Sequence, residues 1–340
     1  MILITGATGL VGGHLLIQLI SKGEKCRALR RATSSLEELK LIAEYYNIDF
    51  ALVESNTQWV EGDILNAEAI NSAMQGVTTL YHCAAVVAFD PNNEERLMRV
   101  NIEGTRLICQ TALECNIKNM VMVSSIAALG KASEGEEIDE NTPRDLSLEY
   151  NAYSKSKYAS ERVVWEYISK GLKASMVNPG IILGVGLLNK GSLQIVEKAS
   201  KWIPIYTSGK TGYVDVRDVA KTMQRIVELN KWGERYILVS DNLTYGDIFK
   251  ALSKALGSLP PLVPLNRTAL SFAASILSLI TKMTGASPKL TPAMVRSATS
   301  QSIYSSKKVQ DNLQIELTPM SETIKEIAKW IIPMSRNSSK

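Results

Sequence analysis

The chain has 340 residues, of which 45% are hydrophobic and 21% charged, an ordinary composition for a globular protein. Its formal net charge of +4 is too small to indicate nucleic-acid binding, and no basic run with interleaved aromatics is present. The four cysteines lack the spacing of metal ligands, so we expect free thiols and no metal site.

The apolar segments predict neither a signal peptide nor a membrane span. Met1–Ile4 is apolar, but no basic residues lead it and it meets Gly6 at once. The longest uncharged apolar stretch, Thr268–Thr281, has fourteen residues, whereas a membrane-spanning helix needs about 20. We therefore expect a cytoplasmic protein.

Short apolar runs alternate with helical patterns through residue 178. This order predicts an α/β fold of the Rossmann type, with a doubly wound parallel sheet and helices on both faces. The expected strands are 2–5, 25–29, 57–60, 77–82, 120–124 and 172–177, and the expected helices are 10–21, 36–46, 67–74, 94–115 and 151–169.

A glycine-rich turn joins the first strand to the first helix. Gly6 permits the turn, Gly9 lets the backbone approach a pyrophosphate, and Gly12 lets the helix pack on the strand. The helix N-terminus offers free N–H groups and a favourable dipole to an anion. The alternative is a plain glycine turn, but the surrounding pattern favours a cofactor site at Gly6, Thr8, Gly9, Leu10, Val11 and Gly12.

The end of the second strand indicates which nicotinamide nucleotide is bound. NAD sites usually place Asp or Glu there, whereas this chain has Arg30 and Arg31 and no acid. Two guanidinium groups suit a 2′-phosphate, so we expect NADP(H), with NAD(H) as the weaker alternative. The arginines could also be a solvated surface patch.

The next two strand ends supply further candidates. Asp63, followed by Ile64, could accept a hydrogen bond from the adenine amino group or cap the next helix. Ala84 and Ala85 are small residues where the backbone must lie close to the cofactor.

Tyr153 and Lys157 lie four residues apart on a predicted helix and therefore share a face. A lysine cation there would stabilise the phenolate and lower the tyrosine pKa from about 10, so that Tyr153 can give or take a proton. Ser125 could hold the same substrate oxygen. The spacing recurs at Tyr206/Lys210 and Tyr304/Lys308, but only the first pair starts a helix after the serine-bearing strand.

After residue 178 the alternation fails. Residues 184–212 have a loop-like pattern, and a helix at 218–228 and a strand at 236–239 follow. Thr318 and Pro319 form an N-cap and first-turn pair before a final helix.

Jointly, these motifs resemble those of an extended short-chain dehydrogenase/reductase of the NAD-dependent epimerase/dehydratase superfamily. The match runs nearly end to end. It rests on Thr5–Gly12, Asp63-Ile64, His82–Ala85, Asn101–Thr105, Val123–Ser125, Tyr153/Lys157, Asn178–Gly180, Tyr213–Ala220, Tyr304–Lys307 and Thr318-Pro319.

The resemblance implies a Rossmann lobe formed by 1–178 and 213–240 and a smaller, mainly helical substrate lobe formed by 179–212 and 241–340. It implies that Ser125, rather than Ser124, is the catalytic serine and that Asn101 supports the tyrosine–lysine pair. Ser124, Lys157, Pro179 and Ile182 would lie on the cofactor. Homodimers are common among such proteins, so a homodimer is possible.

Two motifs that are typical of other branches of this superfamily are absent from the chain, which makes a dehydratase or a UDP-sugar epimerase less favoured. Dehydratases carry Thr-Asp-Glu where this chain has Ser125-Ile126-Ala127, and UDP-sugar epimerases carry a Gln-x-Arg-Asp-Phe segment where only Lys210 is cationic. Asn178-Pro179-Gly180 resembles dihydroflavonol reductases, hydroxysteroid-dehydrogenase-like enzymes and bacterial ketoreductases. Residues 269–281 form an apolar segment, which is a packed core helix, a lid or a surface that contacts a membrane; the last two favour a hydrophobic substrate.

We therefore expect an NADPH-dependent reductase of a small-molecule ketone or aldehyde that uses a Ser-Tyr-Lys relay. A nucleotide-sugar epimerase with a tightly bound cofactor is the first alternative. A non-catalytic NADP-binding sensor or scaffold is the second. The identity of the substrate and the oligomeric state stay open.

Overall fold

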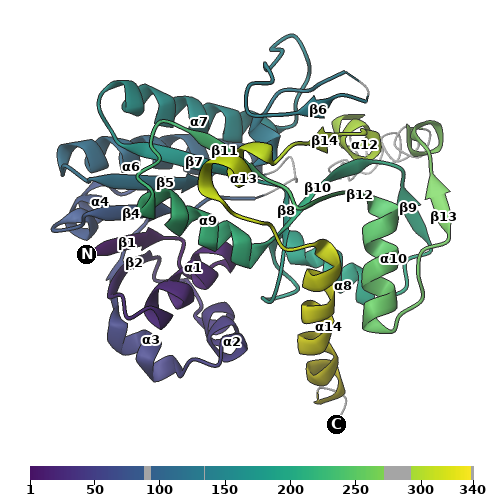
Figure 1. Ribbon diagram of the computed structural model, residues 1–340, viewed down its shortest axis with the longest axis horizontal. Helices are drawn as coiled ribbons and strands as arrows, with labels where there is room; N and C mark the ends of the chain where they lie inside the picture. Colours follow the sequence, from purple (N-terminus) through teal and green to yellow (C-terminus); the bar gives the residue numbers. More distant parts are fainter. Residues whose placement is uncertain (88–92, 134, 272–291, 338–340) are drawn as a thin grey trace, which may run out of the picture.

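The computed structural model describes residues 1–87, 93–133, 135–271 and 292–337 (Figure 1). Its helices are α1 (Leu10–Ser21), α2 (Glu37–Tyr45), α3 (Phe50–Asn56), α4 (Ala67–Met74), α5 (Glu94–Met98), α6 (Gly104–Glu114), α7 (Ala152–Ser169), α8 (Gln194–Ser200), α9 (Val216–Glu228), α10 (Tyr245–Leu256), α12 (Pro292–Thr299), α13 (Lys307–Leu313) and α14 (Met320–Asn337). A π-helical turn, η2 (Arg99–Glu103), joins α5 to α6, and two 3₁₀ turns are η3 (Ile126–Ala128) and η4 (Gly191–Leu193).

The strands are β1 (Ile2–Thr5), β2 (Cys26–Arg30), β3 (Thr57–Glu61), β4 (Thr79–His82), β5 (Asn119–Val123), β6 (Glu137–Ile138), β7 (Ala174–Pro179), β8 (Ile181–Leu183), β9 (Ile205–Thr207), β10 (Lys210–Asp215), β11 (Arg235–Leu238), β12 (Asp241–Thr244), β13 (Val263–Leu265) and β14 (Ile303–Tyr304).

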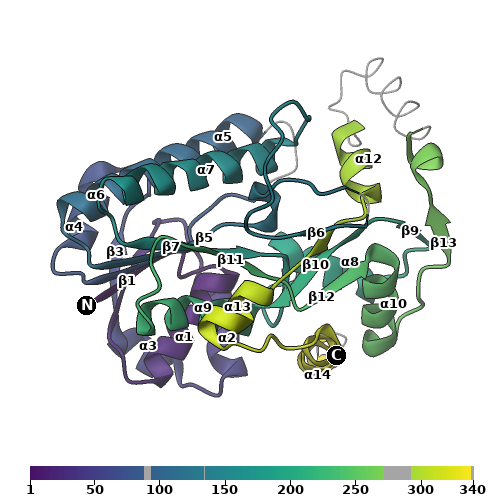
Figure 2. The same ribbon diagram turned by 45° about the horizontal axis from the view of Figure 1, so that its top comes forward.

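Seven strands form one parallel sheet in the order β11-β7-β5-β4-β1-β2-β3. Figure 2 shows α6 and α7 on one side of this sheet and α1 and α9 on the other. The predicted doubly wound Rossmann-type fold is confirmed. The strand order reverses between β1 and β4, which is where such sheets bind ligands at their carboxyl ends.

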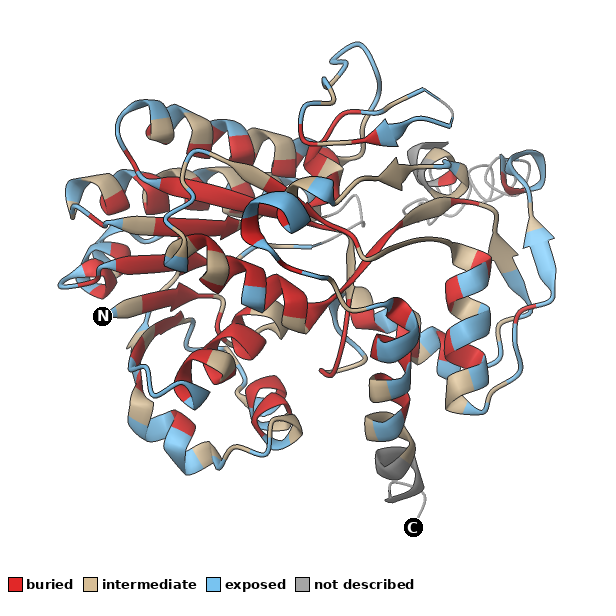
Figure 3. Cartoon of the chain, viewed as in Figure 1, coloured by how far each residue is buried: buried red, intermediate tan, exposed pale blue. Residues whose placement is uncertain are grey.

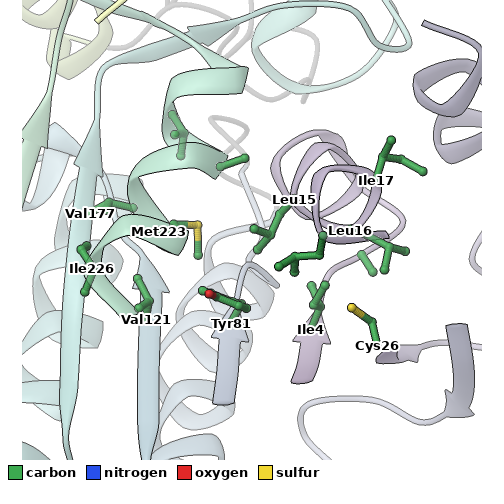
Figure 4. Packing of buried hydrophobic residues seen from close by; sticks show 14 of the residues in the cluster. Ile4, Leu15, Leu16, Ile17, Cys26, Tyr81, Val121, Val177, Met223 and Ile226 are labelled. Carbon is green, nitrogen blue, oxygen red and sulfur yellow. The ribbon is translucent and has the colours of Figure 1, made fainter. Parts of the chain in front are cut away.

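The two faces of the sheet carry separate hydrophobic cores. One packs α1 and α9 on the sheet, with Leu15, Leu16 and Met223 facing Ile4 and Tyr81 (Figure 4). The other lies under α4, α6 and α7. Because both faces are covered, the central strands are buried (Figure 3), which explains their nearly continuous apolar sequence.

The strands and helices expected before residue 178 are present, and most of their boundaries are shifted by no more than two residues. The single helix expected at 94–115 is instead α5, the π-helical η2 and α6 in succession, and α3 was not expected.

The expectation that residues 184–212 are loop-like is wrong. This stretch holds η4, α8, β9 and the start of β10. A three-stranded sheet has the order β12-β10-β8, while β9 pairs with β13 and β6 with β14. One hydrophobic cluster packs β8 and β10 against α8, α10 and α14. These short elements depend on partners distant in sequence. The division of the chain into two lobes stays a prediction.

The start of α14 differs from its predicted cap. The Thr318 backbone N–H and hydroxyl bind the Asp218 carboxylate, at 2.6 and 3.2 Å, so this side chain does not cap the helix. Instead, the Met320 N–H donates to the Asp241 carboxylate of β12 at 2.7 Å. The helix N-terminus is thus satisfied by a tertiary contact.

Residues 272–291, which contain most of the apolar segment 269–281, lie outside the described residues. In the described part of the chain, no helix has the length and apolar character needed to cross a membrane.

Candidate active site

The glycine-rich turn has the shape that an anionic group requires. Gly6 has a φ of +73°, and a Cβ there would lie 2.7 Å from the Ala84 backbone nitrogen. A Cβ on Gly12 would collide with the Gly6 carbonyl, so Gly12 brings α1 onto the turn. Gly9 is the N-cap of α1, and a Cβ there would meet only the Gly6 carbonyl oxygen, at an ordinary contact distance of 3.5 Å.

The first turn of α1 carries unused donors. The first intrahelical donor is the Gly13 N–H, which binds the Gly9 carbonyl at 2.7 Å, so the N–H groups of Leu10, Val11 and Gly12 precede the ladder. No side chain caps this end, and no acidic residue lies in the first turn. Thr8 is partly exposed in the same turn. The turn therefore fits a pyrophosphate.

The neighbouring strand ends lie beside this turn. Arg30 ends β2 and its guanidinium lies over the Trp59 ring, 5.1 Å from the centroid, while Arg31 is exposed. Asp63 accepts from the Leu65 N–H at 2.9 Å, and Asn66, not Asp63, caps α4. Ile64 is buried. Ala84 and Ala85 follow β4, where the Ala84 N–H donates to the Thr5 hydroxyl.

The proposed catalytic side chains meet where β5 ends. Ser125 caps η3, and its Oγ accepts from the Ala127 N–H at 3.1 Å. The Tyr153 side chain of α7 is hydrogen-bonded to Ser125. Lys157, one turn further along α7 and buried, donates from Nζ to the Val123 carbonyl at 3.1 Å. The structure thus brings Ser125, Tyr153 and Lys157 together.

The pKa of Tyr153 is shifted in the direction opposite to the one expected from the sequence. Burial raises the pKa of this phenol, and the Ser125 hydrogen bond only partly opposes it. The predicted lowering by Lys157 is not seen, because burial of the phenol dominates. Burial also lowers the pKa of Lys157 to about 8, although the Glu161 charge opposes that change.

Asn101 lies in the π-helical turn η2, and its side-chain amide is hydrogen-bonded to Val86 and Ser156 rather than to Tyr153 or Lys157. Its amide accepts from the Val86 N–H at 2.8 Å and donates to the Val86 carbonyl and the Ser156 hydroxyl, at 3.0 and 3.1 Å. Both amide hydrogens are used there. Asn101 therefore supports the start of α7 through Ser156 rather than through Lys157 itself.

The hydroxyl of Ser124, a predicted cofactor contact, is hydrogen-bonded to a buried carboxylate. It donates to Glu161 Oε1 at 2.6 Å, and the Asn178 amide reaches the same oxygen at 2.5 Å. The other carboxylate oxygen pairs with Arg235 at 3.0 Å. Sequence reasoning missed Glu161, whose only local signal is its position four residues after Lys157.

A cavity of about 1050 Å³ opens in front of this group. Ser125, Tyr153 and Ile182 line it, and Pro179 ends the adjacent β7. Much of the wall is apolar or aromatic: Val87, Ile126, Leu129, Ile138, Tyr150, Ile181, Ile195, Tyr245 and Tyr304. The sequence singled out Lys210 as the only cation of this segment, but Lys210 does not line the cavity. The cationic side chains of the wall are Lys131, Lys198, Arg267 and Arg296, the last paired with Glu149.

A parallel sheet with a pyrophosphate-binding turn and a tyrosine–lysine pair beside a cavity defines a nicotinamide-nucleotide enzyme. Residues 2–238 match the NAD dependent epimerase/dehydratase family, and the chain belongs to this family. The resemblance to extended short-chain dehydrogenases/reductases is thereby confirmed.

The chain is similar over most of its length to proteins named as reductases. It is 29% identical to a putative dihydroflavonol 4-reductase of Synechocystis sp., over 96% of this chain and 93% of that protein. It is 26% identical to cinnamoyl-CoA reductase 1 of Petunia hybrida, over 76% and 78%. The crystal structure of gox2253 superposes with a TM-score of 0.84 at 30% identity, covering 99% of both chains. The chain is an NAD(P)-dependent oxidoreductase.

Proposed function

We propose that this enzyme is an NADPH-dependent reductase of a hydrophobic ketone or aldehyde. The observation that carries the proposal is the hydrogen bond between Tyr153 and Ser125 in the wall of a large, mainly apolar cavity. Reductases among the similar proteins support the same direction of reaction.

The side chains have separate roles. Ser125 and Tyr153 bind the carbonyl oxygen of the substrate, and Tyr153 donates the proton to it. The raised pKa of Tyr153 keeps the phenol protonated at neutral pH, which suits proton donation. Lys157 holds the nicotinamide ribose and stabilises the phenolate that is left. When bound, NADPH supplies the hydride for the carbonyl carbon.

The residues proposed to bind the cofactor lie at the carboxyl ends of the parallel strands. The N–H groups of Leu10, Val11 and Gly12 bind the pyrophosphate, and Arg30 and Arg31 bind the 2′-phosphate that distinguishes NADP(H) from NAD(H). Asp63 would accept from the adenine amino group through Oδ2, since Oδ1 already accepts from Leu65.

A nucleotide-sugar epimerase is the second candidate. The cationic side chains of the cavity wall favour it, because a diphosphate needs cationic partners. Such an enzyme would return the hydride to its substrate and would bind UDP- or GDP-sugars without net consumption of NADPH.

The test is NADPH consumption by the purified protein against a panel of apolar ketones and aldehydes. Tyr153→Phe should lower kcat at least about 100-fold, because general acid catalysis contributes about 10²–10⁴. Tyr206→Phe is the matched control, since Tyr206 belongs to the second Tyr-x-x-x-Lys pair and should keep wild-type activity. Full activity of Tyr153→Phe would contradict the proposal. Binding of a nucleotide sugar with no carbonyl turnover would favour the epimerase.

A further inference from the structure

Glu161 is a buried carboxylate, 1% exposed, on the same face of α7 as Lys157. We propose that Glu161 is a positioning residue: it fixes the segment Val123–Ser125 and holds Lys157 in its charged form behind the substrate site. The inference rests on the proposed role of Lys157 in catalysis.

The contacts of Glu161 connect α7 to three neighbouring strands of the sheet. Its Oε1 accepts from Ser124 at the end of β5 and from Asn178 in β7, at 2.6 and 2.5 Å. Its Oε2 accepts from Arg235 of β11 at 3.0 Å. A buried carboxylate with three such bonds is fully compensated and therefore rigid.

These contacts extend to the catalytic serine. Asn178 uses its amide both for Glu161 and for the Ser125 carbonyl, the latter at 3.0 Å. Lys157 binds the Val123 carbonyl, and the Ser124 N–H donates to the Val177 carbonyl. Each residue of Val123–Ser125 is thus hydrogen-bonded to a residue of α7 or β7, and Glu161 connects these two elements through its bond to Asn178.

The charge of Glu161 also acts on the Lys157 ammonium group. Burial destabilises the Lys157 cation, and Glu161 is the main opposing influence, with a smaller one from Cys83. His82, on the neighbouring strand, is neutral because burial lowers its pKa to about 3. Arg235 partly neutralises the Glu161 charge. Removal of the Glu161 charge should therefore lower the Lys157 pKa, whereas removal of the Arg235 charge should raise it.

The experiment is a nitrogen-15 NMR titration of the lysine side chains in the protein without cofactor or substrate. The Lys157 signal is assigned by its loss in Lys157→Met. Glu161→Gln keeps the side-chain shape and should lower the Lys157 titration midpoint by about one pH unit, as expected for loss of a neighbouring opposite charge. Arg235→Met should raise it. Glu140→Gln is the control, because this buried carboxylate binds the Ile237 N–H and should leave the midpoint unchanged.

A purely structural role for Glu161 would destabilise the protein without moving the Lys157 midpoint, and that result would overturn the proposal. If Glu161→Gln does not fold, the proposal is tested with Arg235→Met. A Lys157 midpoint that is unchanged or lower in Arg235→Met also overturns the proposal. With a reducible carbonyl compound in hand, the alkaline limb of kcat should shift by the same amount. Failure of the proposed function appears separately, as retained activity in Tyr153→Phe.

Discussion

Arg30 and Arg31 determine which nicotinamide nucleotide we expect this enzyme to prefer. The contact with Trp59 holds the Arg30 guanidinium at the end of β2, where the adenosine ribose of a dinucleotide would lie in the proposed site. Arg31 follows directly and is exposed. Among the described residues, no carboxylate forms an ion pair with either guanidinium, so both are available to a phosphate.

Replacing both arginines by glutamine should lower kcat/KM for NADPH by about 30-fold or more and change the value for NADH less than about threefold. A charge-assisted hydrogen bond contributes about 1.5–3 kcal/mol, and only NADPH carries the phosphate. Initial rates with both nucleotides measure this. Arg27→Gln is the control, because that guanidinium binds Gln58 and the Ala73 and Gln75 carbonyls. Equal losses for both nucleotides would contradict the assignment.

At the residue scale, the sequence predicted those site residues that a local pattern carries. The glycine spacing and the Tyr153/Lys157 spacing each encode one turn and one helix face. Glu161 and Arg235 are 74 positions apart, and no local pattern connects them. The direction of the Tyr153 pKa was also missed, because burial of a side chain follows from tertiary packing.

At the element scale, the start of α14 illustrates the same limit. The Thr318-Pro319 pair placed the helix start correctly to within two residues. However, the groups that satisfy this end are the carboxylates of Asp218 and Asp241, from α9 and β12. The elements after residue 178 were harder to predict for the same reason: β10 pairs with β8 and β12, and α8 has only seven residues.

Asp241→Ala should destabilise the protein by about 1 kcal/mol, within the range of about 0.5–2 kcal/mol for loss of a helix N-terminal acceptor. The Met320 N–H would lose its partner at 2.7 Å. Urea denaturation measures the change in the free energy of unfolding. Glu322→Gln is the control, since this exposed first-turn acid acts only on the helix dipole and should cost less than about 0.5 kcal/mol. Equal effects of the two variants would show that Asp241 acts through charge alone.

At the scale of the whole molecule, the alternation of strands and helices predicted the sheet, and burial on both faces fixed its apolar strands. The same burial has a consequence for the only two histidines of the chain, His14 and His82. His14 bonds the Tyr46 hydroxyl and the Val185 carbonyl, and His82 bonds the hydroxyls of Thr5 and Thr105. Both rings are fully enclosed and neutral.

Stability should therefore fall as the pH is lowered from 7.5 to 5.5. Burial lowers the pKa values of His14 and His82 from 6.5 to about 4 and about 3, so in this range only the unfolded chain takes up the two protons. The expected loss is about 1.4 kcal/mol for each histidine. Burial raises the pKa values of Glu38, Glu140 and Asp218, which acts in the opposite direction.

Comparison of the wild type with His14→Gln isolates the histidine contribution, because the carboxyl groups are common to both proteins. Urea denaturation at pH 7.5 and 5.5 should show a pH-dependent loss in His14→Gln that is smaller than the wild-type loss by about 1.4 kcal/mol, the share of one histidine. An identical loss in both proteins would mean that His14 takes up its proton in the folded state. The ring would then have to be accessible to water, against its complete burial between α1, α2 and the segment after β8.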